Sequence, residues 1–424
     1  MKAMTKPTTV MSLTGNEAAA WALRCARVKV GLSFPLGPNA EVMETAQRFI
    51  DRGEVNDLQI LFGDTEKNTA SMQIGVARLG VRSMLVINSD GMMWATAELH
   101  YSASDRLPVM LVCPSRSLEP PTSLSTDHDD VITMRDHGWL IFYCEDSQDI
   151  FDTIIQAYKV IENESVMLPA IVGFDGYEGT SHASGRVVVP DQGDIDKFLP
   201  PPNFVKPERD YFTVDWKDTF SHRRRMKSLP DQTFMEVKYH QKMAELNAAN
   251  LIEKIGKEFA ETFSSHHVGL IESHECEDAD IILIAMGIIY SDVKFVVDSL
   301  REEGVKVGCI KLRVFHPFPA KALCEKVKGA KLVITLDRNT PGAINSELKS
   351  ALYSYLVNEG KGKTVTPLVM GKVVGIARVL HLKEIGSIIE DGLRALELGK
   401  MERDFDWFPM HGIKYDPSRE VLGE

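Results

Sequence analysis

Glu66 is the residue of this chain whose type and position most directly suggest chemistry. It begins a helical pattern of small residues just after a predicted strand, so its carboxyl group could hold a ligand nitrogen and exchange a proton with it. The ordinary alternative is a favourable charge at a helix N-terminus, where the helix dipole favours acidic residues. Glu66 alone does not decide between these readings, so the neighbouring motifs matter.

Three further polar or proline-rich stretches follow predicted strands: Phe34-Pro35-Leu36-Gly37-Pro38, Asn88-Ser89-Asp90-Gly91 and Ser115-Arg116-Ser117. The turn at Ser89 leads into a helix whose free N–H groups could meet a ligand. Arg116 could bind a carboxylate with two parallel hydrogen bonds, although a surface salt bridge is the ordinary role of such an arginine. Turns and caps are the plain alternative for each stretch.

The run Asp127-His128-Asp129-Asp130 resembles a set of metal ligands, but its spacing argues against one. Adjacent side chains point in different directions, and no second acidic or histidine pair stands one helical turn away. We therefore predict a hydrogen-bonding loop here and assign no metal ligands.

The elements that must position these residues alternate between strands and helices. Predicted strands cover residues 28–34, 57–62, 83–88, 109–113, 140–144, 168–173, 281–286, 307–313, 332–336 and 365–370. Predicted helices cover residues 41–51, 66–79, 92–102, 148–162, 293–303, 320–326, 343–355 and 382–395. This alternation predicts an α/β protein with two doubly wound, mainly parallel sheets. Ligands of such folds bind at the carboxyl ends of the strands, where the motifs above stand.

The composition divides the chain further. We predict a first domain at residues 1–200, a connector rich in proline and aromatic residues at 201–255, a second domain at 256–397 and a docking tail at 398–424. Aromatic residues are rare in flexible linkers, so we expect the connector to be ordered. The aromatic residues of the tail predict contact with a partner protein.

Charge and cysteine content exclude several functions. The net charge of -12 argues against nucleic-acid or anionic-membrane binding, which reward positive charge. The six cysteines form no CxxC pair, so iron–sulfur clusters would have to come from another chain. No apolar run is long enough to span a membrane, and we expect a cytoplasmic, reduced protein. A dinucleotide fingerprint and a P-loop are both missing.

The combination of motifs resembles the alpha subunit of 2-oxoacid:ferredoxin oxidoreductases, the pyruvate:ferredoxin oxidoreductase group, from about residue 12 to 395. Beyond the stretches already quoted, the resemblance rests on Thr14-Gly15-Asn16-Glu17-Ala18, Gly75, Gly80, Arg135, Tyr143-Cys144-Glu145-Asp146, Leu168-Pro169-Ala170, Phe174-Asp175-Gly176-Tyr177, Ala285-Met286-Gly287, Phe315-His316-Pro317-Phe318-Pro319 and Leu336-Asp337-Arg338-Asn339. It implies a thiamine diphosphate-binding fold followed by a transketolase C-terminal-like domain.

The resemblance also implies roles for residues. Glu66 would be catalytic by contacting N1′ of the thiamine aminopyrimidine, and Arg116 by facing the substrate. The cofactor would also contact Pro35, Ser89, Asp90 and Gly91, and the substrate would contact Leu36, Gly37, Arg116, Asp127 and His128.

The remaining chemistry would come from partners. A segment for the cofactor's diphosphate is missing from this chain, so the resemblance implies a beta subunit that carries the diphosphate and Mg²⁺. It further implies gamma and ferredoxin-like delta subunits with iron–sulfur clusters, a ferredoxin or NAD-linked electron acceptor, and coenzyme A as co-substrate.

One departure concerns the substrate. Pyruvate enzymes of this family usually carry a threonine where this chain has Gly37, and the resemblance would aim that hydroxyl at the substrate. Losing such a donor costs about 1.5–3 kcal/mol unless another residue replaces it. We therefore hypothesise a bulkier aryl 2-oxoacid such as phenylglyoxylate, and a rearranged loop in which another residue supplies the contact remains the alternative. Pyruvate, indolepyruvate and oxalate, a non-catalytic assembly subunit and a transketolase relative stay open.

Overall fold

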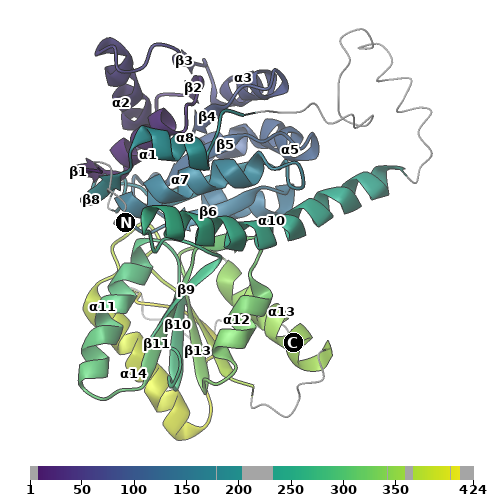
Figure 1. The fold of residues 1–424 in the computed structure, drawn as a ribbon. Coiled ribbons are helices and arrows are strands. Elements are labelled where there is room, and N and C mark those ends of the chain that lie inside the picture. The colour runs from purple at the N-terminus through teal and green to yellow at the C-terminus, as the bar shows by residue number, and fades with distance from the viewer. Residues whose placement is uncertain are drawn as a thin grey trace, which may run out of the picture.

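The computed structural model describes residues 8–410 except 178, 203–232, 341, 359–365 and 402. It contains two α/β units, one above the other in Figure 1, each built on its own sheet. The predicted α/β class with two mainly parallel sheets is therefore confirmed. Among the described helices, none combines the length and apolar composition that crossing a membrane requires.

The first unit is centred on a seven-stranded sheet with the order β12-β6-β7-β5-β4-β2-β3. Its strands are β2 (Val30–Ser33), β3 (Gln59–Phe62), β4 (Ser83–Val86), β5 (Met110–Ser115), β6 (Leu140–Cys144), β7 (Ala170–Asp175) and β12 (Val314–His316). All pairs are parallel except the one between β12 and β6. Strands β4 to β7 are buried along their whole length, as expected for a sheet covered on both faces.

Helices cover both faces of this sheet. They are α1 (Gly15–Cys25), α2 (Ala40–Asp51), α3 (Glu66–Arg78), α4 (Asp90–Trp94), α5 (Thr96–Ser104), α6 (Asp129–Ile132), the 3₁₀ helix η1 (Thr133–His137), α7 (Ser147–Ile161) and α8 (Gln192–Phe198). A two-stranded antiparallel ribbon, β1 (Thr9–Thr14) with β8 (Ser184–Val189), lies beside α1 and α7. Neither of these strands, nor α1, was among the predicted elements.

The helix predicted at 92–102 is interrupted in the structure. Helix α4 ends at Trp94 and α5 begins at Thr96, so Ala95 lies between two shorter helices. The hydroxyl of Thr96 donates to the carbonyl of Met93 at 2.7 Å, and such a bond to the preceding turn bends a helix. The interruption makes α4 a short separate helix that begins directly after Ser89.

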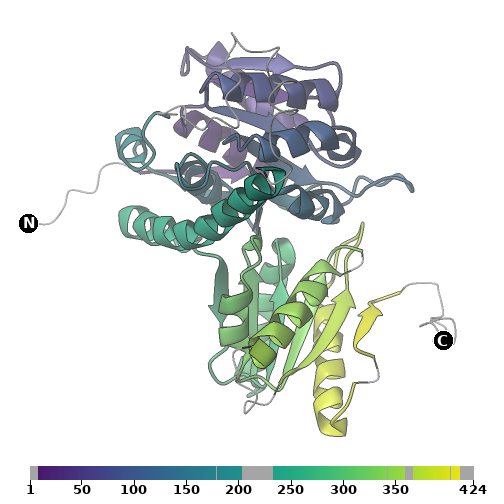
Figure 2. The ribbon, with the colours of Figure 1, turned by 90° about the vertical axis from the view of Figure 1, so that its right-hand side faces the viewer.

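The predicted connector ends earlier than expected. Helix α10 spans Thr233–Phe263 and crosses the boundary we predicted at residue 255, while residues 203–232 lie outside the described part. Ala244, Ala248, Ile252, Ile255 and Phe259 recur at helical spacing and are buried in the core of the first unit, where α10 packs on α7. This apolar stripe follows the proline-rich stretch in the sequence. It makes the second half of the predicted connector part of a helix that lies between the two sheets (Figures 1 and 2).

The second unit has a six-stranded sheet with the order β15-β14-β13-β10-β11-β9. Its strands are β9 (Ile271–His274), β10 (Ile281–Ala285), β11 (Val307–Leu312), β13 (Leu332–Asp337), β14 (Leu368–Val373) and β15 (Phe405–Trp407). Its helices are α11 (Ile288–Glu302), α12 (Ala320–Val327), α13 (Ala343–Asn358) and α14 (Leu382–Leu398). Only β9 is antiparallel to its neighbour.

Part of the predicted docking tail belongs to this sheet. Residues 405–407 form β15, which pairs in parallel with β14 and places Phe405 against Gly342 and Gly371. A Cβ at Gly371 would lie 2.5 Å from the Phe405 ring, so the two glycines make room for it. The aromatic residue that suggested a partner contact is thus used inside the chain, and residues 411–424 lie outside the described part.

Buried ion pairs join the two units. The ammonium of Lys311, on β11, donates to Asp149 at 2.6 Å and to Glu145 at 2.8 Å, both in the first unit. Lys311 and Asp149 have no exposed side-chain surface. Burial opposes both charges, but their mutual attraction raises the pKa of Lys311 and lowers that of Asp149.

We expect Lys311→Met to lower the free energy of unfolding of the full chain by about 3–5 kcal/mol, because it removes the positive charge closest to the buried Asp149 carboxylate. The double variant Lys311→Met/Asp149→Asn should lose less than the sum of the two single losses. Urea titration measures each value. Lys331→Met is the matched control, because Lys331 pairs with Asp280 at 3.0 Å on the surface with 63% of its side chain exposed. Equal losses in Lys311→Met and the control would contradict the prediction.

Candidate active site

Glu66 and Gly91 meet at the carboxyl edge of the first sheet. Glu66 is the first residue of α3, whose N-cap Thr65 accepts a hydrogen bond from the Asn68 N–H. A Cβ at Gly91 would lie 2.6 Å from Cγ and 2.8 Å from Oε1 of Glu66, so only a glycine lets the carboxyl group lie there. Within the described residues no hydrogen-bond donor contacts this half-buried carboxylate, which leaves it available to a ligand.

The turn before Gly91 has an unusual backbone. Ser89 has φ 52° and ψ −139°, a conformation that costs a non-glycine residue of order 1–3 kcal/mol. Two hydrogen bonds hold it there: the Ser89 N–H donates to Oδ2 of Asp130 at 3.0 Å, and its hydroxyl donates to the Ser117 carbonyl at 2.7 Å. Asp90 accepts the N–H of Glu119 at 3.2 Å and so ties the same turn to the next loop.

Asp130 organises two of the predicted loops at once. Its Oδ2 also accepts the Arg116 N–H at 3.2 Å, so one carboxyl group ties the loop after β4 to the loop after β5. Burial, reinforced by the neighbouring Asp127 carboxyl group, raises the pKa of Asp130 to about 7. Sequence reasoning included Asp130 in an acidic run but assigned it no role, since its direction was not visible in the pattern.

Arg116 is largely occupied by its own loop. Its Nε donates to the Ser123 carbonyl at 2.8 Å, its Nη2 contacts Glu119, and only 8% of the residue is exposed. The guanidinium therefore closes the 116–123 loop. A two-pronged contact with a substrate carboxylate would first have to displace Glu119, so the predicted substrate role of Arg116 stays a prediction.

Asp127 and His128 face the boundary between the two units. The Asp127 carboxylate accepts the N–H of Asp129 at 3.0 Å. His128 Nε2 lies 3.3 Å from Oδ1 of Asp175, and Arg338 of the second unit donates to the same oxygen at 2.6 Å. Burial would raise the pKa of Asp175, but Arg338, with His128, lowers it to about 2. Among the described residues no contact joins this pair to Glu66, and their predicted substrate role remains untested.

The loop after β2 contains the third group of predicted residues. Pro35 is exposed, and Leu36 and Gly37 are half-buried. Asn39 accepts the Leu36 N–H at 3.3 Å, and Asn16 of α1 donates to the Pro38 carbonyl at 2.9 Å. A Cβ at Gly37 would overlap the hydroxyl oxygen of Tyr177 and lie 3.0 Å from its Cζ. The space we expected Gly37 to leave for a larger substrate is thus filled by Tyr177.

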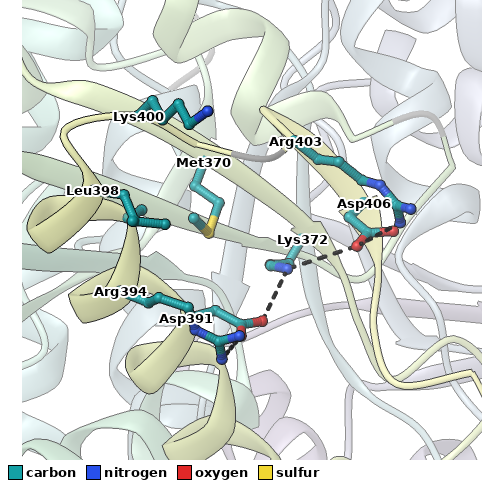
Figure 3. Close-up of a pocket in the computed structure, with 9 residues that line it drawn as sticks. Met370, Lys372, Asp391, Arg394, Leu398, Lys400, Arg403 and Asp406 are labelled. Carbon is teal, nitrogen blue, oxygen red and sulfur yellow. Dashed lines mark hydrogen bonds and ion pairs between the residues drawn. The ribbon is translucent and has the colours of Figure 1, made fainter. Parts of the chain in front are cut away.

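Two other features lie away from these residues. Ligand atoms of Glu145, His267 and Glu272 lie within 4.8 Å of one another, but the Lys311 ammonium already binds Glu145. A cavity of about 200 Å³ opens between β14, α14 and β15 (Figure 3). Its charges pair mainly with one another: Arg394 with Asp391 at 3.0 Å and Arg403 with Asp406 at 3.3 Å. Neither feature includes a predicted site residue.

We expect the stability difference between the wild-type chain and Asp130→Asn to depend on pH. The folded pKa of about 7 exceeds the unfolded value of about 3.9, so the folded state holds this proton more tightly. The contribution of Asp130 therefore falls as pH rises from about 4 to 7, and the variant should gain about 2 kcal/mol relative to wild type between pH 5 and 7. Urea titrations at both pH values test this, with the exposed Asp51→Asn as control. A pH-independent difference would contradict it.

Comparison with known proteins shows the family to which this chain is similar. Residues 22–257 match the family described as pyruvate flavodoxin/ferredoxin oxidoreductase, thiamine diphosphate-binding, and residues 279–370 match pyruvate:ferredoxin oxidoreductase core domain II. Among solved structures, a 2-oxoglutarate:ferredoxin oxidoreductase from Magnetococcus marinus superimposes with TM-score 0.65 at 14% identity, over 91% of this chain and 65% of that one. That likeness shows the fold, and this chain spans about two thirds of that longer chain.

Curated relatives are more similar in sequence. The ketoisovalerate oxidoreductase subunit VorA of Pyrococcus horikoshii is 33% identical over 93% of this chain and 97% of its own length. The pyruvate synthase subunit PorA is 33% identical in Methanosarcina barkeri, over 91% of this chain and 93% of its own. The pyruvate synthase subunit PorA of Pyrococcus furiosus is 32% identical, over 95% of this chain and 98% of its own length. The chain therefore belongs to the pyruvate flavodoxin/ferredoxin oxidoreductase family and is a thiamine diphosphate-dependent 2-oxoacid:ferredoxin oxidoreductase alpha subunit.

Proposed function

We propose that this chain is the alpha subunit of a multi-subunit enzyme that oxidatively decarboxylates a 2-oxoacid to an acyl-CoA. Electrons would pass to iron–sulfur clusters on partner subunits and then to ferredoxin or an NAD-linked subunit. The observation that carries the proposal is the Glu66 carboxyl group, which lies against Gly91 at the sheet edge where such folds bind ligands and has no donor among the described residues.

The residues at this edge fit the aminopyrimidine of thiamine diphosphate. Gly91 lacks the Cβ that would push Glu66 aside, and the Ser89 turn is held by Asp130. When bound, thiamine diphosphate supplies a nucleophilic carbon and an electron sink for the loss of CO₂. Glu66 would hold the ring nitrogen N1′ by a hydrogen bond and keep a proton at that atom. Pro35, Ser89, Asp90 and Gly91 would contact the cofactor.

Exposed apolar side chains beside the site support a partner subunit. Phe62 ends β3 four residues before Glu66 and is 57% exposed, and Trp94 ends α4 and is 70% exposed. Large apolar side chains next to a site that lacks a diphosphate-binding segment suit a surface that another chain covers. We infer that the covering chain is a beta subunit that carries the diphosphate and Mg²⁺. Gamma and ferredoxin-like delta subunits would be further partners, with the iron–sulfur clusters on partner subunits, and coenzyme A would be the co-substrate.

Which 2-oxoacid the enzyme uses is a separate proposal. The relatives named above act on pyruvate and ketoisovalerate according to their names, and an aryl 2-oxoacid such as phenylglyoxylate remains our hypothesis for this chain. Its support is the missing threonine at Gly37. The second argument, free space at Gly37, does not hold because Tyr177 fills that space.

A panel of acids offered to the natively purified complex decides the substrate. Pyruvate, 2-oxoisovalerate, 2-oxoglutarate, indolepyruvate, oxalate and phenylglyoxylate would each be added anaerobically, with and without coenzyme A, while cluster bleaching is followed optically. We expect phenylglyoxylate to bleach the clusters faster than pyruvate. Equal or faster bleaching by pyruvate would contradict the aryl hypothesis and leave the enzyme class intact.

We expect Glu66→Gln to slow cluster reduction about 10²–10⁴-fold, because an amide cannot exchange the proton that a carboxyl group exchanges with N1′. Gly91→Ala should cause a comparable loss, since its Cβ would displace the Glu66 carboxyl group. Gly75→Ala is the matched control: it lies on the same helix α3, and nothing stands within 4 Å of the added Cβ. Full turnover in Glu66→Gln would instead support a non-catalytic assembly subunit.

A further inference from the structure

The hydroxyl of Tyr177 occupies the position of a side chain that Gly37 lacks. Tyr177 follows β7, and Gly37 follows β2, which lies three places away in the sheet order. A Cβ at Gly37 would overlap the Tyr177 hydroxyl oxygen, with Cζ 3.0 Å and Cε2 3.4 Å away. The tyrosine therefore reaches across the carboxyl edge of the sheet into the loop after β2. It places a hydroxyl group where a threonine at position 37 would have placed its own.

Gly176, directly before Tyr177, allows the loop after β2 to approach closely. Gly176 donates its N–H to the Thr126 hydroxyl at 2.7 Å, and a Cβ at Gly176 would lie 3.1 Å from Cγ of Pro38. Any side chain at Gly176 would also overlap the Ser115 carbonyl oxygen. The missing side chain at position 176 thus allows the loop after β2 to lie against the start of the Tyr177 segment.

The aromatic ring of Tyr177 is held in place from the other side. It stacks on His182 with a centroid distance of 5.0 Å and an interplanar angle of 13°. His182 is in turn held by a 2.7 Å hydrogen bond between its Nδ1 and the Ser181 hydroxyl. Stacking fixes the ring but makes no use of the phenol oxygen. Among the described residues the Tyr177 hydroxyl has no hydrogen-bond partner, and the residue is 37% exposed.

We propose that the Tyr177 hydroxyl binds the 2-oxoacid substrate and sets its selectivity in place of a side chain at position 37. This proposal rests on the proposed function above. A phenol O–H can donate to the carboxylate or the 2-oxo oxygen, and a hydrogen bond to a charged acceptor contributes more than one between neutral groups. The rigid ring delivers that donor with little loss of side-chain freedom, unlike a longer flexible chain. Tyr177 is thus a substrate-binding residue that the sequence pattern did not reveal.

Tyr177→Phe removes the hydroxyl and keeps the stacked ring, so it tests the donor alone. In the purified holo complex we expect kcat/KM for the preferred 2-oxoacid to fall about 10- to 100-fold. The rate with acids that wild type uses poorly should change much less. The ratio of kcat/KM between the preferred acid and these acids should therefore fall. Thermal midpoint, thiamine diphosphate content and the KM for coenzyme A should stay at wild-type values. Tyr101→Phe is the matched control, because Tyr101 lies on α5 and is 58% exposed.

In the double variant Gly37→Thr/Tyr177→Phe, the threonine at position 37 supplies the hydroxyl group that Tyr177 has lost. We expect it to recover at least 10-fold of the loss for the preferred 2-oxoacid, whereas Gly37→Thr alone should not, because its Cβ would overlap the Tyr177 oxygen. Unchanged selectivity in Tyr177→Phe would overturn the inference. A wild-type complex whose clusters respond to none of the acids would count against the proposed function, and these two failures are distinguishable.

Discussion

The candidate active site depends on one buried carboxyl group, that of Asp130. It accepts backbone N–H groups from both Ser89 and Arg116 through a single oxygen. A buried N–H without an acceptor costs about 1–3 kcal/mol, so the loss of Asp130 would destabilise the present positions of both loops. The Ser89 backbone lies in a region that non-glycine residues rarely adopt. Its position determines where Gly91 lies, and Gly91 determines where the Glu66 carboxyl group can lie.

A second buried network ties this edge of the sheet to the other unit. Asp175, at the end of β7, is bound by His128 from the first unit and by Arg338 from the second. Lys311 and Asp149 form the corresponding pair at the other buried contact. Such pairs contribute little net stability relative to apolar contacts, but removing one member is costly. They therefore favour one arrangement of the units, in which the chain segments around Asp175, including Tyr177, are held against the loop after β2.

The parallel sheet explains why residues far apart in sequence collect at one edge. Ser33, Phe62, Val86, Ser115 and Asp175 all end parallel strands, and the residues that follow them form the site. The alternation of apolar runs and amphipathic helices predicted this, along with most strand positions to within a few residues. Two elements were missed because of local composition. Next to the proline-rich stretch, the apolar stripe of α10 was not recognised as a helix. The aromatic residues of the tail suggested contact with a partner, and β15 in that tail pairs with β14.

The sequence by itself determined the α/β class, the two sheets, the family resemblance and the placement of Glu66, Ser89 and Gly91 after their strands. These features follow from patterns within short stretches, which depend on side-chain periodicity and turn chemistry alone. Only the tertiary structure decided that Asp130 binds two loops, that Arg116 is occupied by Glu119, and that Tyr177 fills the space at Gly37. Apart from the contact between Arg116 and Glu119, they join residues that lie too far apart in the chain for a local pattern to predict them. They depend on side-chain directions, which are set only once the strands have packed into one sheet.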